Sequence, residues 1–277
     1  MTISKQIVRP KTFFVLTFFL SWLIWIPLDL SHFGIGPLHI PEGLSSIVRL
    51  FGVLMPAVSA LLLTANAGSG QAIRHLLGRL VVWRVGWKWW GAAVIIQPAL
   101  LVLSGWLFNG IWGTPPIESI PMISFAALVV NIFFLLLATL GEEIGWRGVG
   151  LPELERQQSA AQSSLVLGLL WATWHIPFWL LLDTFDQFGW MYLGLNFLLV
   201  LPMTFYITWF FNHGRFSILL PVASHLSFNI VNTVLFPVTT NVIAFGLFIA
   251  MEWLIALWVT PRIEPATGIR DVLIEQP

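Results

Sequence analysis

The stretch 122–150, MISFAALVVNIFFLLLATLGEEIGWRGVG, joins a long apolar run to two adjacent glutamates and an arginine. About 20 apolar residues are enough for a helix to cross a bilayer, so this stretch predicts a transmembrane helix from Met122 to about Gly148. The whole chain shares this character: 57% of its 277 residues are hydrophobic, only 9% are charged, and the mean hydropathy is +0.86. Soluble domains carry about 25% charged residues. We therefore expect most of the chain to lie in lipid.

Seven more apolar runs predict further transmembrane helices, so we expect an all-α polytopic membrane protein with about eight spans. These runs are Thr12–Leu30, Ile47–Ala65, Gly91–Trp112, Ser164–Leu182, Trp190–Phe211, Ile218–Phe236 and Asn241–Thr260. The first run lacks a small-residue cleavage site, which indicates a retained helix rather than a signal peptide. Pro221 is expected to interrupt the run that begins at Ile218. Residues Gln71 to Trp90 alternate Arg and Lys with Leu, Val and Trp, which predicts an amphipathic helix in the inner interface.

We expect one integral-membrane domain with three parts. Residues 1–121 hold the N-terminal helices and the interfacial helix, 122–236 hold the polar motifs, and 237–277 hold the last helix and a cytoplasmic tail. The chain has 13 basic and 13 acidic residues, a balance that suggests no nucleic-acid partner. It has no cysteine, which excludes disulfides, thiolate metal sites and a cysteine nucleophile.

The basic residues predict the orientation of the chain in the membrane. If the N-terminus is inside, every basic residue except Arg49 falls in a cytoplasmic segment. These residues are Lys5, Arg9, Lys11, Arg74, Arg79, Arg84, Lys88, Arg147, Arg156, Arg215, Arg262 and Arg270. Because cytoplasmic loops are enriched in Lys and Arg, we expect an integral protein of the inner (plasma) membrane with both termini in the cytoplasm.

Ionisable groups inside the hydrocarbon are costly and usually have a function. The candidates are Glu142, Glu143, His175, His225 and Glu252, together with the neutral amide of Asn229. In a helix, residues four apart share a face, so Glu143 and Arg147 are expected to pair. Glu142 is rotated by about 100° from Glu143 and is left free for chemistry. The alternative is that this charge cluster only marks the end of a helix.

Depth relates the first motif to the two histidines. Counted at about 1.5 Å per residue from the cytoplasmic end, Glu142 lies roughly 9 Å deep, His175 about 16 Å and His225 about 11 Å. His225 and Asn229 are four apart and also share a face. Each residue alone is explained by a hydrogen bond between helices. Three helices that place such groups in the same inner layer instead predict a site.

The predicted site suits hydrolysis of an amide. A poorly solvated glutamate beside an imidazole can activate water as a general base, and a histidine with an asparagine amide can donate hydrogen bonds to the oxyanion. Alternatively, the two histidines and a glutamate could bind zinc, which would supply the activated water. The residues alone leave both options open. His-Glu-x-x-His is absent, as are the Gly-x-Ser-Gly of serine-type and the Gly-x-Gly-Asp of aspartyl-type intramembrane proteases.

Three segments, in order, resemble the motifs of the CPBP family, which contains type II CAAX prenyl proteases and bacteriocin-processing or immunity (Abi) proteins. EEIGWR matches Glu-Glu-x-x-x-Arg, WATWH is close to Phe-x-x-x-His, and HLSFN matches His-x-x-x-Asn. The resemblance covers Met122 to Phe236. Trp171 stands where the family usually has phenylalanine, which keeps an aromatic ring and is expected to reshape the pocket.

The resemblance implies an intramembrane endopeptidase that hydrolyses a peptide bond of a membrane-associated substrate, such as a prenylated CAAX-type protein. By resemblance, Glu142 and His175 would activate the water, and His225 and Asn229 would form the oxyanion hole. Glu143 and Arg147 would then brace the first motif. The partners implied are a membrane peptide or protein and the lipid bilayer.

For the cofactor, we favour a site that needs none, because a Glu/His pair and an amide donor are a complete set of catalytic groups. Zinc is the alternative, and its ligands would come from Glu142, Glu143, His175 and His225. Two other functions are a proton-coupled transporter and a non-catalytic immunity protein. Transporters commonly show matching halves, whereas the polar residues here lack a counterpart in the first half. Glu252, in IAMEWLIA, is not explained by the protease hypothesis.

Overall fold

The computed structural model describes residues 9–37, 39–67, 70–113, 124–232 and 241–263, and across them every regular element is a helix. Six of the described segments are long and apolar enough to cross a membrane: Pro10–His32, Gly43–Ala67, Trp87–Trp112, Phe125–Glu155, Trp190–His213 and Val242–Arg262. The protein is thus an all-α polytopic integral membrane protein, as expected, and the count of eight spans stays a prediction. The expected domain boundaries, at 121/122 and 236/237, fall outside the described residues.

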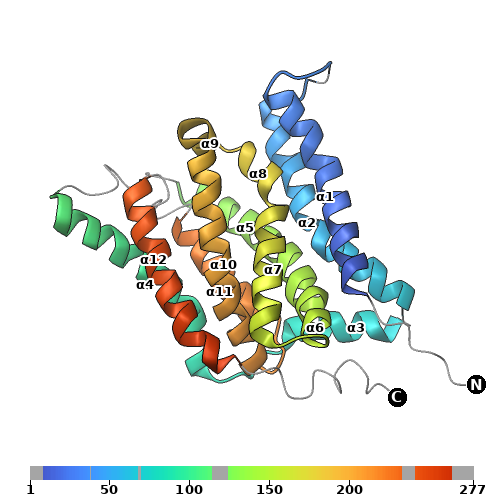
Figure 1. Ribbon diagram of the computed structural model, residues 1–277. Coiled ribbons are helices and arrows are strands. Elements are labelled where there is room, and N and C mark those ends of the chain that lie inside the picture. Colours follow the sequence, from blue (N-terminus) through green and yellow to red (C-terminus); the bar gives the residue numbers. More distant parts are fainter. Residues whose placement is uncertain (1–8, 38, 68–69, 114–123, 233–240, 264–277) are drawn as a thin grey trace, which may run out of the picture.

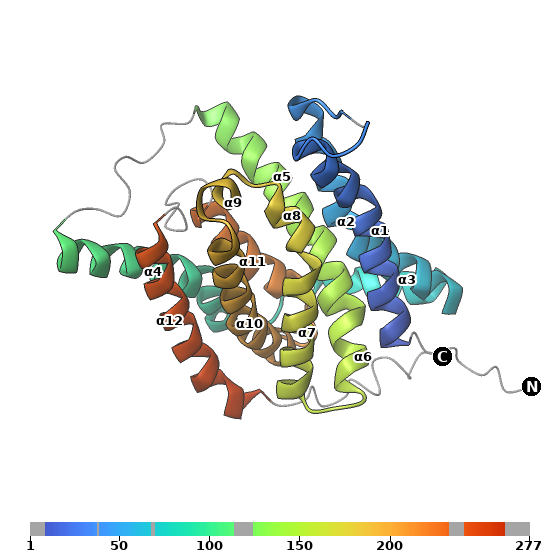
Figure 2. The ribbon, with the colours of Figure 1, turned by 45° about the horizontal axis from the view of Figure 1, so that its top comes forward.

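The helices form two groups that meet at α5 (Phe125–Gly145). On one side, α2 (Glu42–Ala67) packs between α1 (Pro10–His32) and α5. On the other, α10 (Trp190–His213) packs between α7 (Ala160–Trp174) and α12 (Val242–Val259). The short α11 (Leu219–Ile230) lies behind α10, against α4 (Trp87–Trp112) and α5, so it is enclosed by its neighbours (Figures 1 and 2).

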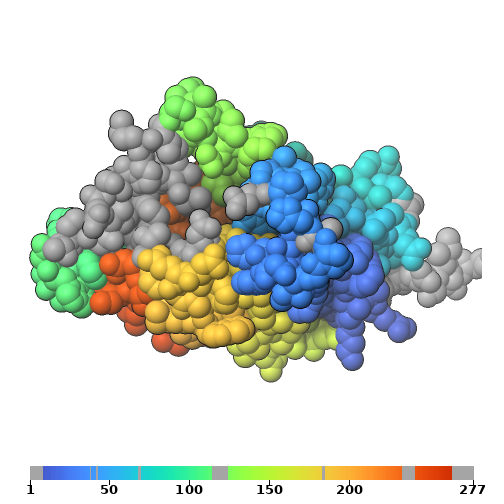
Figure 3. Space-filling view, turned by 90° about the horizontal axis from the view of Figure 1, so that it is seen from above, coloured from blue at the N-terminus to red at the C-terminus, as the bar shows by residue number. Residues whose placement is uncertain are grey.

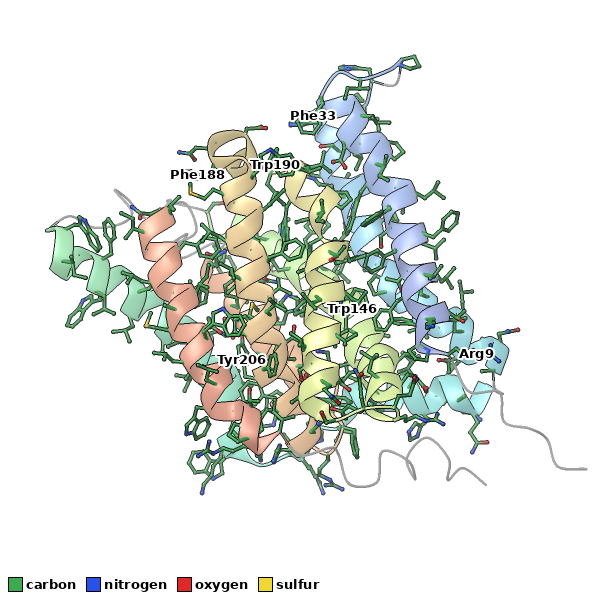
Figure 4. All side chains as sticks on the ribbon, viewed as in Figure 1. Arg9, Phe33, Trp146, Phe188, Trp190 and Tyr206 are labelled. Carbon is green, nitrogen blue, oxygen red and sulfur yellow. The ribbon has the colours of Figure 1, made fainter. Side chains whose placement is uncertain are left out.

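The molecule is apolar outside and carries its polar groups inside. Large apolar side chains such as Phe19, Trp106 and Phe125 are exposed, while Glu142, Glu252 and other charged groups are buried. Figure 4 shows Trp146 and Tyr206 in the interior of the bundle. This is the distribution expected of a chain whose outer surface faces lipid, because an exposed polar group there would have no hydrogen-bonding partner.

Two glycines bring α5 directly against α2. A Cβ at Gly141 would lie 2.7 Å from Cδ2 and 3.0 Å from Cα of Leu54, and one at Gly145 would lie 2.6 Å from the carbonyl carbon of Pro56. Such spacings leave no room for any side chain, so glycine is required for the backbones to meet. The two glutamates lie between these glycines in the sequence, and the contact therefore fixes the segment that carries them.

The predicted span Ser164–Leu182 is wrong as a single helix. Helix α7 ends at Trp174, His175 is its C-cap, and a separate short helix, α8 (Ile176–Leu180), follows. Pro177 explains the break, because proline has no backbone N–H to donate and its ring clashes with the carbonyl four residues earlier. His175 therefore lies at a junction between helices instead of in mid-helix. The chain continues through α9 (Asp183–Phe188) into α10.

Two other boundaries differ from expectation. Helix α11 begins at Leu219, so Pro221 falls in its first turn, where proline is tolerated, and does not interrupt it. The expected interfacial helix 71–90 is shorter: α3 covers Gly70–Gly78, the 3-10 turn η1 covers Arg79–Val81, and α4 begins at Trp87.

Helix α3 runs across the lower ends of the long helices in Figure 1, whereas Figure 3 views the opposite end, with α5 on one side of the molecule and α9 on the other.

Candidate active site

The EEIGWR segment ends α5 and leads into an unusual turn. Glu142 and Glu143 lie in the last turn of α5, and Trp146–Gly150 then form one π-helical turn (η2) before the short helix α6 (Leu151–Glu155). Single π turns inside α-helices occur frequently at functional sites. Both glutamate side chains are buried, so each must be compensated by neighbouring groups.

Glu143 is compensated by Arg147, as predicted from their spacing. The Oε1 atom of Glu143 lies 2.9 Å from Nη1 of Arg147, and both side chains are fully buried. Arg147 also lies against Trp171, with its Cζ atom 4.5 Å from the ring centroid. Arg147 is therefore held in the interior of the protein, because a paired guanidinium on an aromatic face can be buried.

His225 joins the same carboxylate from α11. Its Nδ1 atom lies 2.9 Å from Oε1 of Glu143. A carboxylate only accepts, so Nδ1 carries the hydrogen and donates it. Glu143 thus links the first and third motifs, in addition to bracing Arg147.

Glu142 pairs instead with the second motif. Its Oε2 atom accepts a hydrogen bond of 2.6 Å from Nε1 of Trp171 and lies 3.6 Å from Nε2 of His175. The other ring nitrogen of His175, Nδ1, lies 2.9 Å from the Trp171 carbonyl oxygen and must donate to it. In the neutral ring, Nε2 therefore presents a lone pair toward Glu142. The 3.6 Å separation is too long for a direct hydrogen bond and suits a small molecule that donates to both atoms.

Asn229 faces α5 from the same helix as His225. Its Nδ2 atom donates a hydrogen bond of 3.3 Å to Oγ1 of Thr139, which precedes Glu142 and Glu143 by about one helical turn. The structure thus brings five of the six predicted site residues into a group of three, Glu143 with Arg147 and His225, and a pair, Glu142 with His175. The sixth, Asn229, contacts α5 about one turn before the glutamates. Thr139 was not predicted, and a lone threonine in an apolar run carries no signal that singles it out.

The four candidate zinc ligands do not fit a zinc site in this arrangement. They form two pairs, Glu142 with His175 and Glu143 with His225, and Oε1 of Glu143 is already shared by Arg147. Within the described ranges, no three His, Cys, Asp or Glu side chains are grouped so that they could hold a metal ion. A zinc site needs at least three protein ligands that converge on one point.

Two residues near the site play parts that were not predicted from the sequence. Trp171 was expected to keep an aromatic ring and reshape the pocket, and the hydrogen bond from its N–H to Glu142 was not predicted. Arg79 was expected at the interface, but it is buried and donates three hydrogen bonds of 3.0 Å to the carbonyls of Phe216, Gly148 and Arg147. Burial lowers the pKa of Arg79 to about 10, so it remains charged at neutral pH.

Glu252 lies in a separate buried polar cluster between α4, α10 and α12. Its Oε1 atom accepts a hydrogen bond of 2.8 Å from Nε2 of Gln97, which also contacts the hydroxyl of Tyr206. Neither of these two contacts involves the histidines. The protease hypothesis left Glu252 unexplained, and the structure assigns it a partner that joins α4 to α12.

Comparison with known proteins agrees with the motifs. Residues 124–231 match the model of the family described as "Type II CAAX prenyl endopeptidase Rce1-like". The chain is also 28% identical, over 272 residues, to the "CAAX prenyl protease 2" of Methanococcus maripaludis, an alignment that covers 92% of this chain and 96% of the archaeal protein. Together with the three motifs gathered in one interior cluster, these matches support the resemblance of the chain to the CPBP family of type II CAAX prenyl protease-like membrane proteins.

Proposed function

We propose that this protein is an intramembrane endopeptidase in which Glu142 and His175 activate the attacking water. The observation that carries the proposal is the geometry of these two side chains, which come from different helices and present two acceptor atoms 3.6 Å apart. A water between them would donate one hydrogen to each acceptor. Its oxygen lone pair would then be free to attack.

The proposed reaction begins when the water oxygen attacks the carbonyl carbon of the scissile peptide bond. Glu142 takes the proton as general base, and the carbonyl π electrons move to oxygen to form a tetrahedral oxyanion. Collapse of the oxyanion breaks the C–N bond, and Glu142 returns the proton to the leaving amine. The products are a carboxylic acid and an amine, and no other reactant is consumed.

His225 and Asn229 are the proposed donors to the oxyanion. Nδ1 of His225 donates to Glu143, so Nε2, on the other side of a doubly protonated ring, is the proposed donor to the oxyanion. Asn229 would add an amide N–H from the next turn of α11. Glu143 and Arg147 are proposed to hold this arrangement without touching the substrate.

The proposed site needs no cofactor, and the proposed substrate is a membrane-associated protein with a prenylated CAAX-type C-terminus. The substrate class follows the printed name of the archaeal relative, a CAAX prenyl protease. We further propose that the end of the molecule with α3 lies on the cytoplasmic side of the inner membrane. Arg74 lies in α3, and Arg84 and Lys88 follow within the next ten residues or so, which is the enrichment in basic residues expected on that side.

The test is cleavage of an internally quenched, farnesylated CAAX peptide by the purified full chain in detergent. Glu142→Gln should lower kcat by about 10²–10⁴-fold, the usual contribution of a general base. The control is Glu155→Gln, because Glu155 is also buried and accepts its hydrogen bond of 2.8 Å from Asn212, an interaction that glutamine can keep. It should retain full activity.

Four outcomes would contradict the proposal. Activity retained in Glu142→Gln would remove the base. Activity lost with a chelator and restored by zinc would overturn the metal-free mechanism. Solute uptake into proteoliposomes without proteolysis would favour the transporter, and binding of a peptide without its cleavage would favour the immunity protein.

A further inference from the structure

Trp171 lies at the centre of the site and contacts members of all three motifs. Its side chain is 1% exposed, and its Nε1 donates to Oε2 of Glu142 at 2.6 Å. Its ring lies 5.3 Å from that of His225 in an edge-to-face arrangement and 5.9 Å from that of His175. A phenylalanine at this position would fill much of the same space but could not donate a hydrogen bond.

The indole is held in place by a buried cation. The guanidinium of Arg147 lies over the ring, with Cζ 4.5 Å from its centroid. In the described part of the chain, Nε and Nη2 of Arg147 have no hydrogen-bond partner, so the electron-rich ring face is the group that compensates this side of the cation. Glu143 fixes Arg147 in turn at 2.9 Å. The position of the indole is therefore set by the supporting pair of the first motif.

One residue thus holds both members of the Glu142–His175 pair. The indole N–H of Trp171 binds the carboxylate, and its backbone carbonyl accepts from Nδ1 of His175 at 2.9 Å. The same carbonyl also accepts the backbone N–H of His175 at 3.3 Å, and its two lone pairs allow both hydrogen bonds. The side-chain bond restricts a flexible glutamate, and the backbone bond selects the tautomer of the histidine. Both are needed to aim two acceptors at the same water.

We propose that Trp171 is a positioning residue, whose indole N–H sets the orientation of the Glu142 carboxylate toward His175. The hydrogen bond occupies Oε2 of Glu142. A carboxylate oxygen can accept a second hydrogen bond, so Oε2 can still receive the proton of a water that lies between it and Nε2 of His175, 3.6 Å away. The proposal rests on the proposed function, in which Glu142 is the general base.

Trp171→Phe tests the proposal by removing the donor while keeping an aromatic ring. We expect kcat for the quenched farnesylated peptide to fall roughly 10- to 100-fold, as expected for the loss of a hydrogen bond to a charged group. KM should stay within about twofold, because the substrate does not contact the lost N–H. A general packing defect would instead change kcat and the melting temperature in detergent together.

Trp25→Phe is the matched control. Trp25 is fully buried, and its Nε1 donates to the carbonyl oxygen of Arg49 at 3.0 Å, away from both glutamates. The control removes the same atoms and one partly buried hydrogen bond, so it should lower stability and leave kcat unchanged. A second variant, Trp171→benzothienylalanine, has sulfur in place of N–H and the same bicyclic shape. It should reproduce the loss of kcat even if Trp171→Phe folds poorly.

The outcomes separate this proposal from the proposed function. If Glu142→Gln is inactive while both Trp171 variants keep kcat within about threefold of the wild type, Glu142 is the base and Trp171 does not position it. Equal losses of kcat in Trp25→Phe and Trp171→Phe would also overturn the proposal. Full activity in Glu142→Gln would refute the proposed function itself, whatever the Trp171 variants do.

Discussion

At the residue scale, two glutamates that are adjacent in the chain have different partners. Glu143 is held by Arg147 and His225, both at 2.9 Å, whereas Glu142 is held by Trp171 and faces His175. The difference follows from helix geometry, because consecutive side chains point about 100° apart. One carboxylate therefore belongs to the framework and the other to the proposed water-activating pair.

This division predicts opposite effects for two identical substitutions. Glu143→Gln removes the partner of a fully buried guanidinium, and breaking such a pair costs about 3–5 kcal/mol of folding free energy. Thermal unfolding in detergent should therefore show a large loss of stability. Glu142→Gln should melt close to the wild type, since glutamine can still accept from Trp171, and should lose only activity. Equal melting temperatures for the two variants would contradict the assignment.

At the element scale, the site depends on how closely α5 approaches α2. The contact is possible because Gly141 and Gly145 have no side chains at the point where the two backbones meet. Pro177 has a second effect at this scale, because it ends α7 and leaves His175 at a helix junction. Both features determine where helices run or end, and so where Glu142 and His175 lie.

Gly145→Ala should therefore impair both stability and activity. A methyl group there would lie 2.6 Å from the carbonyl carbon and 2.7 Å from the carbonyl oxygen of Pro56, so α5 must shift. Overpacking of this kind costs typically 1–3 kcal/mol, and a shift of α5 also moves Glu142. The control is Gly246→Ala on α12, where a Cβ meets open space. Unfolding and cleavage assays should show a defect in the first variant only, and an unaffected Gly145→Ala would mean that α2 and α5 can separate without harm.

At the scale of the whole molecule, a second polar cluster ties together helices that the active site does not join. Glu252 on α12 contacts Gln97 on α4, and Gln97 contacts Tyr206 on α10. Gln97 and Tyr206 are neutral side chains, so Glu252 needs a hydrogen-bond acceptor to bind Gln97 and does not need a negative charge. The cluster differs in this respect from the Glu143–Arg147 pair.

We therefore expect Glu252→Gln to keep both the fold and proteolysis within about twofold, because glutamine preserves the acceptor that binds Gln97. Glu252→Leu should melt at a lower temperature, since it leaves the buried amide of Gln97 without that partner. Cleavage rates and melting curves of the two variants distinguish the roles. Loss of proteolysis in Glu252→Gln at an unchanged melting temperature would make Glu252 part of the catalytic machinery.

The sequence by itself determined the features that depend on local chemistry. The lack of charge and the length of the apolar runs predicted an all-α membrane protein, because lipid requires every backbone group to bond within its own helix. The spacing of Glu143 and Arg147 predicted their pair, because residues four apart meet on one helix face. Pro177 carries a local signal for the break at His175, but the span Ser164–Leu182 was predicted from the length of the apolar run alone.

Only the tertiary structure decided which distant groups meet. His225 reaches Glu143 across 82 residues of sequence, Trp171 reaches Glu142 across 29, and Arg79 reaches the carbonyl of Arg147 across 68. Periodicity places a residue on a face of its own helix, but it does not say which helix packs against that face. That choice depends on the close contact of α2 with α5 and on the enclosure of α11 by its neighbours. These contacts arise from steric fit between helices, which no local pattern encodes.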